Sequence, residues 1–354
     1  MRVAILASPF ISVPPARYGG TELFIASLAE SLTAKGVEVV VYSNGESKVN
    51  AEVRWRYAKS DWPLANPMAG MAKELDHFSW ALQDAAEDCD IIHLNSAVAI
   101  AYTRFISRSM LCTLHHPYEE ALHELYVRYP NLQYVAISHN QASLYTDLNL
   151  HTIHHGIDLS QYRLRAKKDG YLCFLGRIAP LKGVHIAIQA AKQTGIPLKI
   201  AGEVQPVFQD YYDTEVKPYI DGTFIEYIGE ADLAMKNELL GGSVGMLFPI
   251  DWEEPFGLVM LEAMACGTPV FAFGRGAVPE VICEGVSGNI CTSLEDMVSC
   301  ICAMKFDSGS VRRWVEHNFS AEVMTSHYLS LYKRIIEENT EIGATVTSGG
   351  EVVA

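Results

Sequence analysis

The chain lacks the features that define several classes of protein. No stretch reaches the roughly 18 uninterrupted apolar residues that a membrane-spanning helix requires. Basic residues are scarce, with 27 Lys and Arg against 42 Asp and Glu, and the formal net charge is −15. This balance disfavours nucleic acid as a partner, because a phosphate backbone needs a clustered basic surface. It also weakens binding to an anionic membrane face, although peripheral contact with the membrane stays open.

The spacings that mark disulfide frameworks and common metal sites are also missing. The eight cysteines contain no C-x-x-C pair, and we expect them to be reduced residues of the core. The 12 histidines form no H-E-x-x-H pattern. The first apolar stretch, residues 3–7, is short and leads into a turn, which predicts a β-strand rather than a signal peptide. We therefore expect a cytoplasmic protein, with the cytoplasmic membrane face as its one possible membrane contact.

What the chain does have is an alternation of short apolar runs and amphipathic segments. Its 354 residues suggest two domains. We predict strands at residues 3–7, 38–42, 91–94, 110–114 and 134–137, and helices at 21–35 and 76–88. The pattern restarts near residue 171, with strands at 171–175, 198–201, 224–227, 246–248 and 270–272 and a helix at 183–193. Continuous apolar runs are typical of parallel strands buried on both faces, so we predict doubly wound α/β domains.

A polar segment without apolar periodicity, residues 158–170, separates the two halves and is the predicted linker. We assign residues 1–160 to an N-terminal domain and residues 161–318 to a C-terminal domain. The pattern of residues 311–338 predicts two helices with a break at 318–320. For residues 339–354 we predict a loose tail. Two such domains would face each other across a cleft at the carboxyl ends of their strands, where ligands bind in α/β folds.

The most informative segment begins at Glu253 and ends at Val270. It contains two carboxylates eight residues apart, Glu254 and Glu262, with a Pro-Phe-Gly turn and the start of an apolar helix between them. The turn leaves backbone N–H groups free at the helix N-terminus, where an anion binds well. The two acids are too far apart to contact one group, so the pattern predicts a long polar ligand, such as a nucleotide-sugar, bound at three points.

Two further loops carry features that suit a phosphorylated ligand. Gly19 and Gly20 precede a predicted helix, and their missing side chains let the backbone approach an anion closely. The loop from Gly176 to Gly183 places Arg177 and Lys182 at a strand end, where both can bind a diphosphate. Small residues at the strand-end turn that contains Gly202 suggest room for a base or a ribose. The G-x-G-x-x-G fingerprint of dinucleotide enzymes is absent, so a dehydrogenase is the least favoured reading.

Two histidine pairs stand at strand ends or turns. His115 and His116 follow a predicted buried strand, and strand alternation places only one of them on the cleft side. Either could bind a sugar hydroxyl or a developing charge, and the residues themselves leave the choice between them open. The second pair, His154 and His155, comes just before the linker and is interpreted as a hinge turn rather than a metal site.

Taken together, these motifs make the chain resemble the retaining glycosyltransferases of family four, the group 1 type with the GT-B fold. The matching motifs follow the family's order along nearly the whole chain: Tyr18-Gly19-Gly20-Thr21-Glu22, Thr113-Leu114-His115, His155-Gly156-Ile157-Asp158, Gly176-Arg177, Lys182-Gly183, Ala201-Gly202, Tyr227-Ile228-Gly229, Glu254 to Glu262, and Gly267-Thr268-Pro269-Val270. One departure is His155, which stands where the family commonly has Asn.

The resemblance implies a role for each matching residue. The catalytic set would be His115, Arg177, Lys182 and Glu254, with the two cations holding the diphosphate and Glu254 binding the donor sugar. Donor binding would involve Gly19, Gly20, Gly202, Glu262 and the backbone amides of Phe256, Gly257 and Leu258. Glu262 would bind the ribose. The family's last helix returns to the first domain, which suits residues 319–338. Enzymes of this kind usually work without a bound metal or other cofactor.

The implied activity is transfer of a hexose from a nucleoside-diphosphate sugar, with a UDP-sugar and UDP-glucose favoured on family frequency. The acceptor would be a sugar, a lipid-linked glycan or a small glycoside, bound by loops such as residues 43–66 and 117–130. Polysaccharide or glycoconjugate biosynthesis is the expected setting. Two alternatives remain: a nucleotide-sugar 2-epimerase of the same fold, and a nucleotide-sugar-binding protein without catalysis. The sequence leaves the oligomeric state undetermined.

Overall fold

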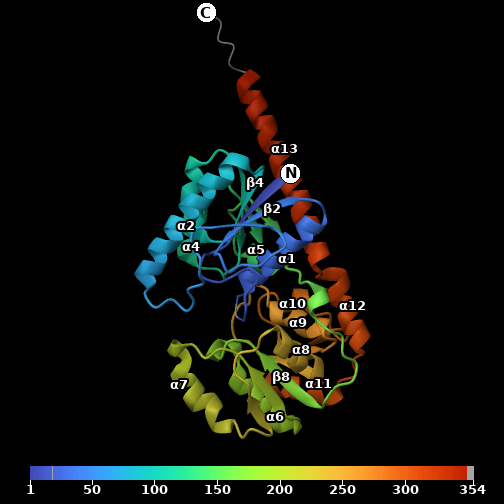
Figure 1. Ribbon diagram of the computed structural model, residues 1–354. Coiled ribbons are helices and arrows are strands. Elements are labelled where there is room, and N and C mark those ends of the chain that lie inside the picture. The colour runs from blue at the N-terminus through green and yellow to red at the C-terminus, as the bar shows by residue number, and fades with distance from the viewer. Residues whose placement is uncertain (18, 349–354) are drawn as a thin grey trace, which may run out of the picture.

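The computed structural model describes residues 1–17 and 19–348, with side chains as far as Glu341. Two lobes lie one above the other, and each is built around a parallel β-sheet covered by helices on both faces (Figure 1). The predicted class, α/β with two Rossmann-like domains, is confirmed.

The first sheet has seven parallel strands in the order β3-β2-β1-β4-β5-β6-β7. Its strands are β1 (Arg2–Leu6), β2 (Glu38–Ser43), β3 (Glu52–Trp55), β4 (Ile91–Leu94), β5 (Ser109–Leu114), β6 (Gln133–Ala136) and β7 (Leu150–Thr152). Its helices are α1 (Gly20–Ala34), α2 (Pro67–Asp88), α3 (Ala97–Ile100), α4 (Glu120–Tyr126) and α5 (His139–Ser143). The order reverses between β1 and β4, and a crevice forms at such a switch point at the carboxyl ends of the strands.

The second sheet repeats this plan with six strands in the order β10-β9-β8-β11-β12-β13. Its strands are β8 (Tyr171–Leu175), β9 (Leu198–Ala201), β10 (Ile225–Tyr227), β11 (Ser243–Phe248), β12 (Val270–Phe273) and β13 (Gly288–Cys291). Its helices are α6 (Val184–Thr194), α7 (Gln209–Tyr211), α8 (Leu233–Gly242), α9 (Leu258–Ala265), α10 (Val278–Val281), α11 (Leu294–Ala303) and α12 (Ser308–Asn318). The switch point lies between β8 and β11.

The central strands are buried on both faces, which explains why they appear in the sequence as continuous apolar runs. In β1, all residues from Val3 to Leu6 are fully buried. Side chains on one face, such as Ile5, join a core with α1, and those on the other face, such as Leu6, join a core with α2. Alternate residues of a strand therefore hold helices against opposite faces of the sheet.

The last helix ties the two domains together. Helix α13 (Ala321–Ser348) runs from the lower lobe along the outside of the upper one (Figure 1). Its Tyr328 and Tyr332 are fully buried against the first domain, where Tyr332 Oη lies 2.7 Å from His93 Nδ1. The crossing is held by the backbone, because Ile157 N–H donates to the carbonyl of Phe319 and Ala321 N–H donates to that of Ile157.

Several predicted boundaries are wrong. Helix α13 reaches Ser348, so the loose tail predicted for residues 339–354 is wrong for residues 339–348. Extending a formed helix costs less than starting one. Residues 349–354 lie outside the described part of the chain. Helix α2 begins nine residues before the predicted start, because Asn66 caps it and Pro67 takes its first position. Strands β3, β7 and β13 and helices α3, α4, α5, α7, α8, α10 and α11 were not predicted. Not every cysteine is in the core, since Cys302 is exposed.

Candidate functional site

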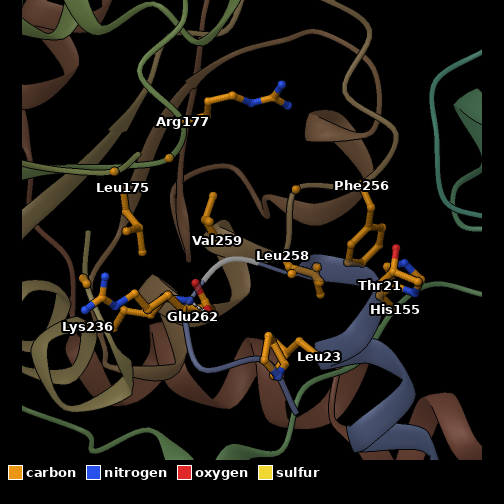
Figure 2. A pocket seen from close by; sticks show the side chains of 18 of the residues that line it. Thr21, Leu23, His155, Leu175, Arg177, Lys236, Phe256, Leu258, Val259 and Glu262 are labelled. Atoms are coloured by element: carbon orange, nitrogen blue, oxygen red, sulfur yellow. Dashed lines mark hydrogen bonds and ion pairs between the residues drawn. The ribbon is translucent and has the colours of Figure 1, made fainter. Parts of the chain in front are cut away.

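A cavity of about 480 Å³ lies between the two domains, within the size range of small-ligand sites. Residues at the carboxyl ends of strands in both sheets line it, together with the first turns of α1 and α9. Both switch points therefore open into the same space. In Figure 2, Glu262 and Lys236 lie at one end of the pocket, while His155 and Phe256 lie at the other.

One end of the cavity is formed around Glu262 of helix α9, which is only 1% exposed. Its Oε1 accepts hydrogen bonds from the Tyr162 hydroxyl and from Lys236 Nζ, each at 2.8 Å. Its Oε2 is buried and has no partner in the protein. A buried carboxylate oxygen without a donor is costly, so this oxygen is suited to accept a hydroxyl from a ligand.

Two helix N-termini face the middle of the cavity. Helix α9 follows Gly257, which caps it with a backbone angle φ of 87°, in the left-handed region that favours glycine. Helix α1 begins at Gly20, and a side chain added there would come within 3.8 Å of Leu258. The first N–H groups of each helix lack partners within the helix and carry the positive end of the dipole. Together they make this region favourable for an anion.

The loop after β8 contributes the cations to the site. Arg177 lines the cavity, its Nε is buried without a partner, and its Nη1 reaches Gln205 Oε1 at 3.4 Å. Lys182 Nζ lies 2.6 Å from Glu254 Oε2 and 4.4 Å from the centre of the Trp252 ring. Glu254 Oε2 also accepts from Trp252 Nε1 at 2.9 Å. The predicted acid and the predicted cation are thus paired with each other.

Gly202 lies where β9 turns toward the cavity. A β-carbon added to it would lie 1.8 Å from the carbonyl oxygen of Gly176, so no side chain fits there without moving the loop after β8. Glycine at this position allows the ends of β8 and β9 to approach closely, and it keeps the cavity wall flat between Arg177 and Glu203.

The structure resolves the choice between the first two histidines. His115 lines the cavity, and its Nε2 lies 2.9 Å from Asn95 Oδ1. Burial, reinforced by the nearby His116, lowers the pKa of His115 to about 3, so the imidazole is neutral. His116 is absent from the cavity wall, and its Nε2 bonds the Tyr126 hydroxyl inside the first domain. The cavity-facing histidine is therefore the one that the family resemblance favours, and its role in catalysis stays a prediction.

Sequence reasoning did not assign several residues of the cavity wall to the site, among them His155, Tyr162, Lys236 and Trp252. His155 was interpreted as part of a hinge turn, but it is buried and stacks on His115 with ring centres 5.3 Å apart. Tyr162 belongs to the segment predicted as a linker and is 3% exposed. The one signal available in the sequence for His155 was that it stands where the family commonly has Asn. Nothing in the local pattern marked the other three.

Acidic and histidine clusters lie outside the cavity. The sequence contains one D-x-D triplet, Asp88-Cys89-Asp90, which sequence reasoning overlooked; its carboxylates bind Arg2 and Arg54 near the amino ends of the strands. Among the described residues, one group could hold a metal ion, namely His139, His154 and Glu280. That group also lies off the cavity wall, and Glu280 already accepts backbone N–H bonds from α5.

The two facing Rossmann-like domains, with a cavity between the carboxyl ends of their strands, define the class of the GT-B glycosyltransferases. Sucrose-phosphate synthase from Thermosynechococcus elongatus has the same fold, with a TM-score of 0.79 and 18% identity over 95% of this chain and 99% of that one. Anabaena HepE, solved in complex with UDP and glucose, has a TM-score of 0.74 and 17% identity over 94% of this chain and 100% of that one. At these identities the likeness concerns the fold alone.

Family models identify the group within this class. The model described as Glycosyltransferase Family 4 matches residues 18–161, and the one described as Glycosyl transferases group 1 matches residues 158–316. The chain belongs to the group 1 glycosyltransferases of family four.

Among curated relatives, the D-inositol 3-phosphate glycosyltransferase of Mycobacterium tuberculosis (strain H37Rv) is 29% identical over 231 residues, covering 57% of this chain and 47% of the relative. The chain thus matches about half the length of that protein. No helix in the described part of the chain is long and apolar enough to cross a membrane.

Proposed function

We propose that the chain is a retaining glycosyltransferase that moves a hexose from a nucleoside-diphosphate sugar to a sugar or lipid-linked glycan. The favoured donor is UDP-glucose or a similar UDP-hexose. Binding of UDP and glucose by the structural neighbour HepE and the glycosyltransferase activity named for the mycobacterial relative both support this assignment. No metal is assigned a role in the proposed reaction.

The observation that carries the proposal is the buried, unpartnered Oε2 of Glu262, a residue that lines one end of a cavity that also contains an anion site. A ribose hydroxyl would satisfy this oxygen. The diphosphate would then lie against the N-termini of α1 and α9, within reach of Arg177 and Lys182. The hexose would extend toward Glu254 and His115, whose polar atoms suit hydroxyl groups.

The proposed reaction follows from this placement. The bond between the anomeric carbon and the phosphate oxygen breaks, and its electron pair leaves with the diphosphate. Arg177, Lys182 and the helix N-termini stabilise the charge that develops there, and removal of one such donor typically costs ~3–4 kcal/mol. The acceptor hydroxyl attacks the same face of the sugar and passes its proton to the leaving phosphate oxygen. The configuration at the anomeric carbon is retained.

The first test is ligand binding, measured as thermal shifts with UDP, GDP, ADP and NAD⁺, each with and without EDTA. A ligand at 100 times its Kd stabilises the fold by ~2.7 kcal/mol. We expect a shift with UDP that EDTA does not change and that Glu262→Gln reduces. The matched control is Glu316→Gln, which alters an exposed carboxylate on α12. A shift with NAD⁺ alone, or with none of the four, contradicts the proposal.

The second test separates transfer from the alternatives. With UDP-glucose and a glycan acceptor, we expect a glycoside whose anomeric proton has the same configuration as the donor, measured by NMR. Release of a sugar altered at its second carbon from donor alone indicates a 2-epimerase. Binding of UDP without any conversion of donor, across sugar and lipid-linked acceptors, indicates a protein that binds nucleotide-sugars without catalysis.

A further inference from the structure

His155 occupies a position that the proposed reaction does not yet use. It comes just after β7, in the turn that precedes the crossing at Ile157, and it lines the cavity while being only 3% exposed. Its ring packs among three other rings: it stacks on His115 at 5.3 Å, and its centre lies 4.6 Å from Phe24 and 5.1 Å from Phe256. Packing on several sides holds the imidazole in one orientation.

The two nitrogens of His155 have different surroundings. Nδ1 is buried and has no hydrogen-bond partner, whereas Nε2 has no partner in the protein and is not among the buried atoms. Because His155 lines the cavity, the edge of its ring that carries Nε2 faces the cavity. Burial lowers the pKa of His155 well below its usual range, and the neighbouring histidines reinforce this, so the ring carries one proton.

A second buried histidine has a similar arrangement around its Nδ1. His77 also has a buried, unpartnered Nδ1, and its Nε2 lies 3.0 Å from the carbonyl oxygen of Ala7. A carbonyl only accepts, so Nε2 of His77 is protonated and its Nδ1 is a buried lone pair. The same tautomer in His155 avoids burying an unpaired N–H donor and directs Nε2–H into the cavity.

His115 presents the opposite group to the same space. The amide of Asn95 donates from Nδ2 to the carbonyls of Leu6 and His93, which leaves Oδ1 to accept from Nε2–H of His115. The Nδ1 of His115 is then an unprotonated acceptor, and it has no partner in the protein. The cavity wall thus offers a donor and an acceptor on two stacked, neutral rings.

We propose that His155 is a specificity-determining residue of the donor-sugar site. Its Nε2–H donates to the oxygen of one hexose hydroxyl, and Nδ1 of His115 accepts the hydrogen of that same hydroxyl. A hydroxyl oxygen with two ~2.8 Å hydrogen bonds near the tetrahedral angle bridges nitrogens ~4.6 Å apart. The edges of two stacked rings whose centres lie 5.3 Å apart can present nitrogens at such a separation. The inference rests on the proposed function, since it requires a nucleotide-sugar whose hexose reaches this end of the cavity.

The first experiment uses the wild-type protein and calorimetric Kd values for UDP, UDP-glucose and analogues in which one sugar hydroxyl at a time is replaced by hydrogen or fluorine. We expect one position at which the deoxy analogue binds ~5- to 150-fold more weakly than UDP-glucose, the range for leaving a buried polar group unpaired. Fluorine accepts weakly but cannot donate to His115, so the fluoro analogue should also lose affinity. Equal affinity for all the analogues overturns the inference.

The second experiment repeats the series with His155→Phe, which keeps a ring in the stack but removes the donor. We expect UDP to bind within about twofold of wild type and the discrimination at that position to fall by at least about fivefold. The control is His77→Phe, which alters a buried histidine away from the cavity and should keep the wild-type discrimination. Unchanged discrimination in His155→Phe overturns the inference while the proposed function stands. Failure of the wild type to bind UDP overturns the proposed function.

Discussion

Lys182 and Glu254 form an ion pair with an N–O distance of 2.6 Å in the wall of the cavity between the domains. Both side chains are largely buried, with 14% and 10% of their surfaces exposed. The Trp252 ring lies against the lysine and its N–H donates to the carboxylate. A donor phosphate would therefore meet a lysine already placed by a carboxylate, which lowers the entropy cost of ordering that long side chain.

This pairing predicts that stability and catalysis respond differently to mutation. Lys182→Met should lower kcat/KM by about 10²- to 10³-fold, because a charge aimed at the leaving group is lost. It should also lower the free energy of unfolding by ~1–3 kcal/mol, because Glu254 is left beside Trp252 without its cation. Urea unfolding and steady-state kinetics measure the two effects.

The double variant Lys182→Met with Glu254→Gln provides the control for that prediction. Removing both charges should restore part of the lost stability without restoring activity, so the two mutations should couple in unfolding. Strictly additive losses of stability would mean that the ion pair does not hold this part of the wall.

The free oxygen of Glu262 predicts recognition of the ribose. We expect wild type to bind UDP ~5- to 150-fold more tightly than the analogue that lacks the contacted ribose hydroxyl, because that oxygen would remain unpaired and buried. Glu262→Gln should bind both ligands with similar, weaker affinity. Calorimetry with UDP and its 2′-deoxy and 3′-deoxy forms measures this difference. A Glu262→Gln variant that still discriminates as wild type does would show that the carboxylate contacts another group.

The buried carboxyl group of Glu22 should make the free energy of unfolding depend on pH. The side chain is 7% exposed, and burial raises the pKa of its carboxyl from 4.5 to about 7. The folded protein therefore holds this proton more tightly than the unfolded chain does. The resulting stability is fully present below pH 4.5, is lost as the pH rises toward 7, and amounts to a change on the order of 3 kcal/mol.

Glu22→Gln should remove this change, so its advantage over wild type should grow between pH 5 and pH 7 in urea unfolding. Glu316→Gln, an exposed carboxylate, serves as the matched control and should follow the wild-type curve. Parallel curves for wild type and Glu22→Gln across this range would contradict the assignment of a raised pKa.

The carboxylate of Glu280 connects the two domains through hydrogen bonds. It belongs to α10 of the second domain, and it accepts backbone N–H bonds from His139 and Asn140 at the start of α5 in the first, each at 2.7 Å. It also lies 2.7 Å from Nε2 of His154. Burial opposes the charge, but these hydrogen bonds together hold the carboxyl pKa of Glu280 below its usual value.

A lowered carboxyl pKa gives stability that is present above the ordinary value and lost as the pH falls through the folded one. Glu280→Gln should therefore destabilise the protein by ~1.5–3 kcal/mol at pH 7, the usual worth of hydrogen bonds to a charged group. The difference from wild type should shrink as the pH is lowered toward 3, measured by urea unfolding. A difference independent of pH would mean that the charge on Glu280 contributes nothing.

The fold followed closely from the sequence because it depends on local patterns. Continuous apolar runs such as β1 are typical of a parallel sheet covered on both faces, and the restart near Tyr171 marked the second sheet. Short edge strands such as β3 were missed, since four half-exposed residues resemble a loop. The end of α13 was missed because helix propagation depends on the preceding turns rather than on an apolar stripe.

The sequence by itself determined which chemical groups are present and near which elements. The spacing of Glu254 and Glu262 around a glycine-capped turn holds in any structure in which α9 is a helix. The tertiary structure alone decided which groups meet: it paired Lys182 with Glu254, left one oxygen of Glu262 unpartnered, and stacked His155 on His115. These contacts join residues distant in the chain, and their energies depend on burial and distance, which arise only when each domain has folded.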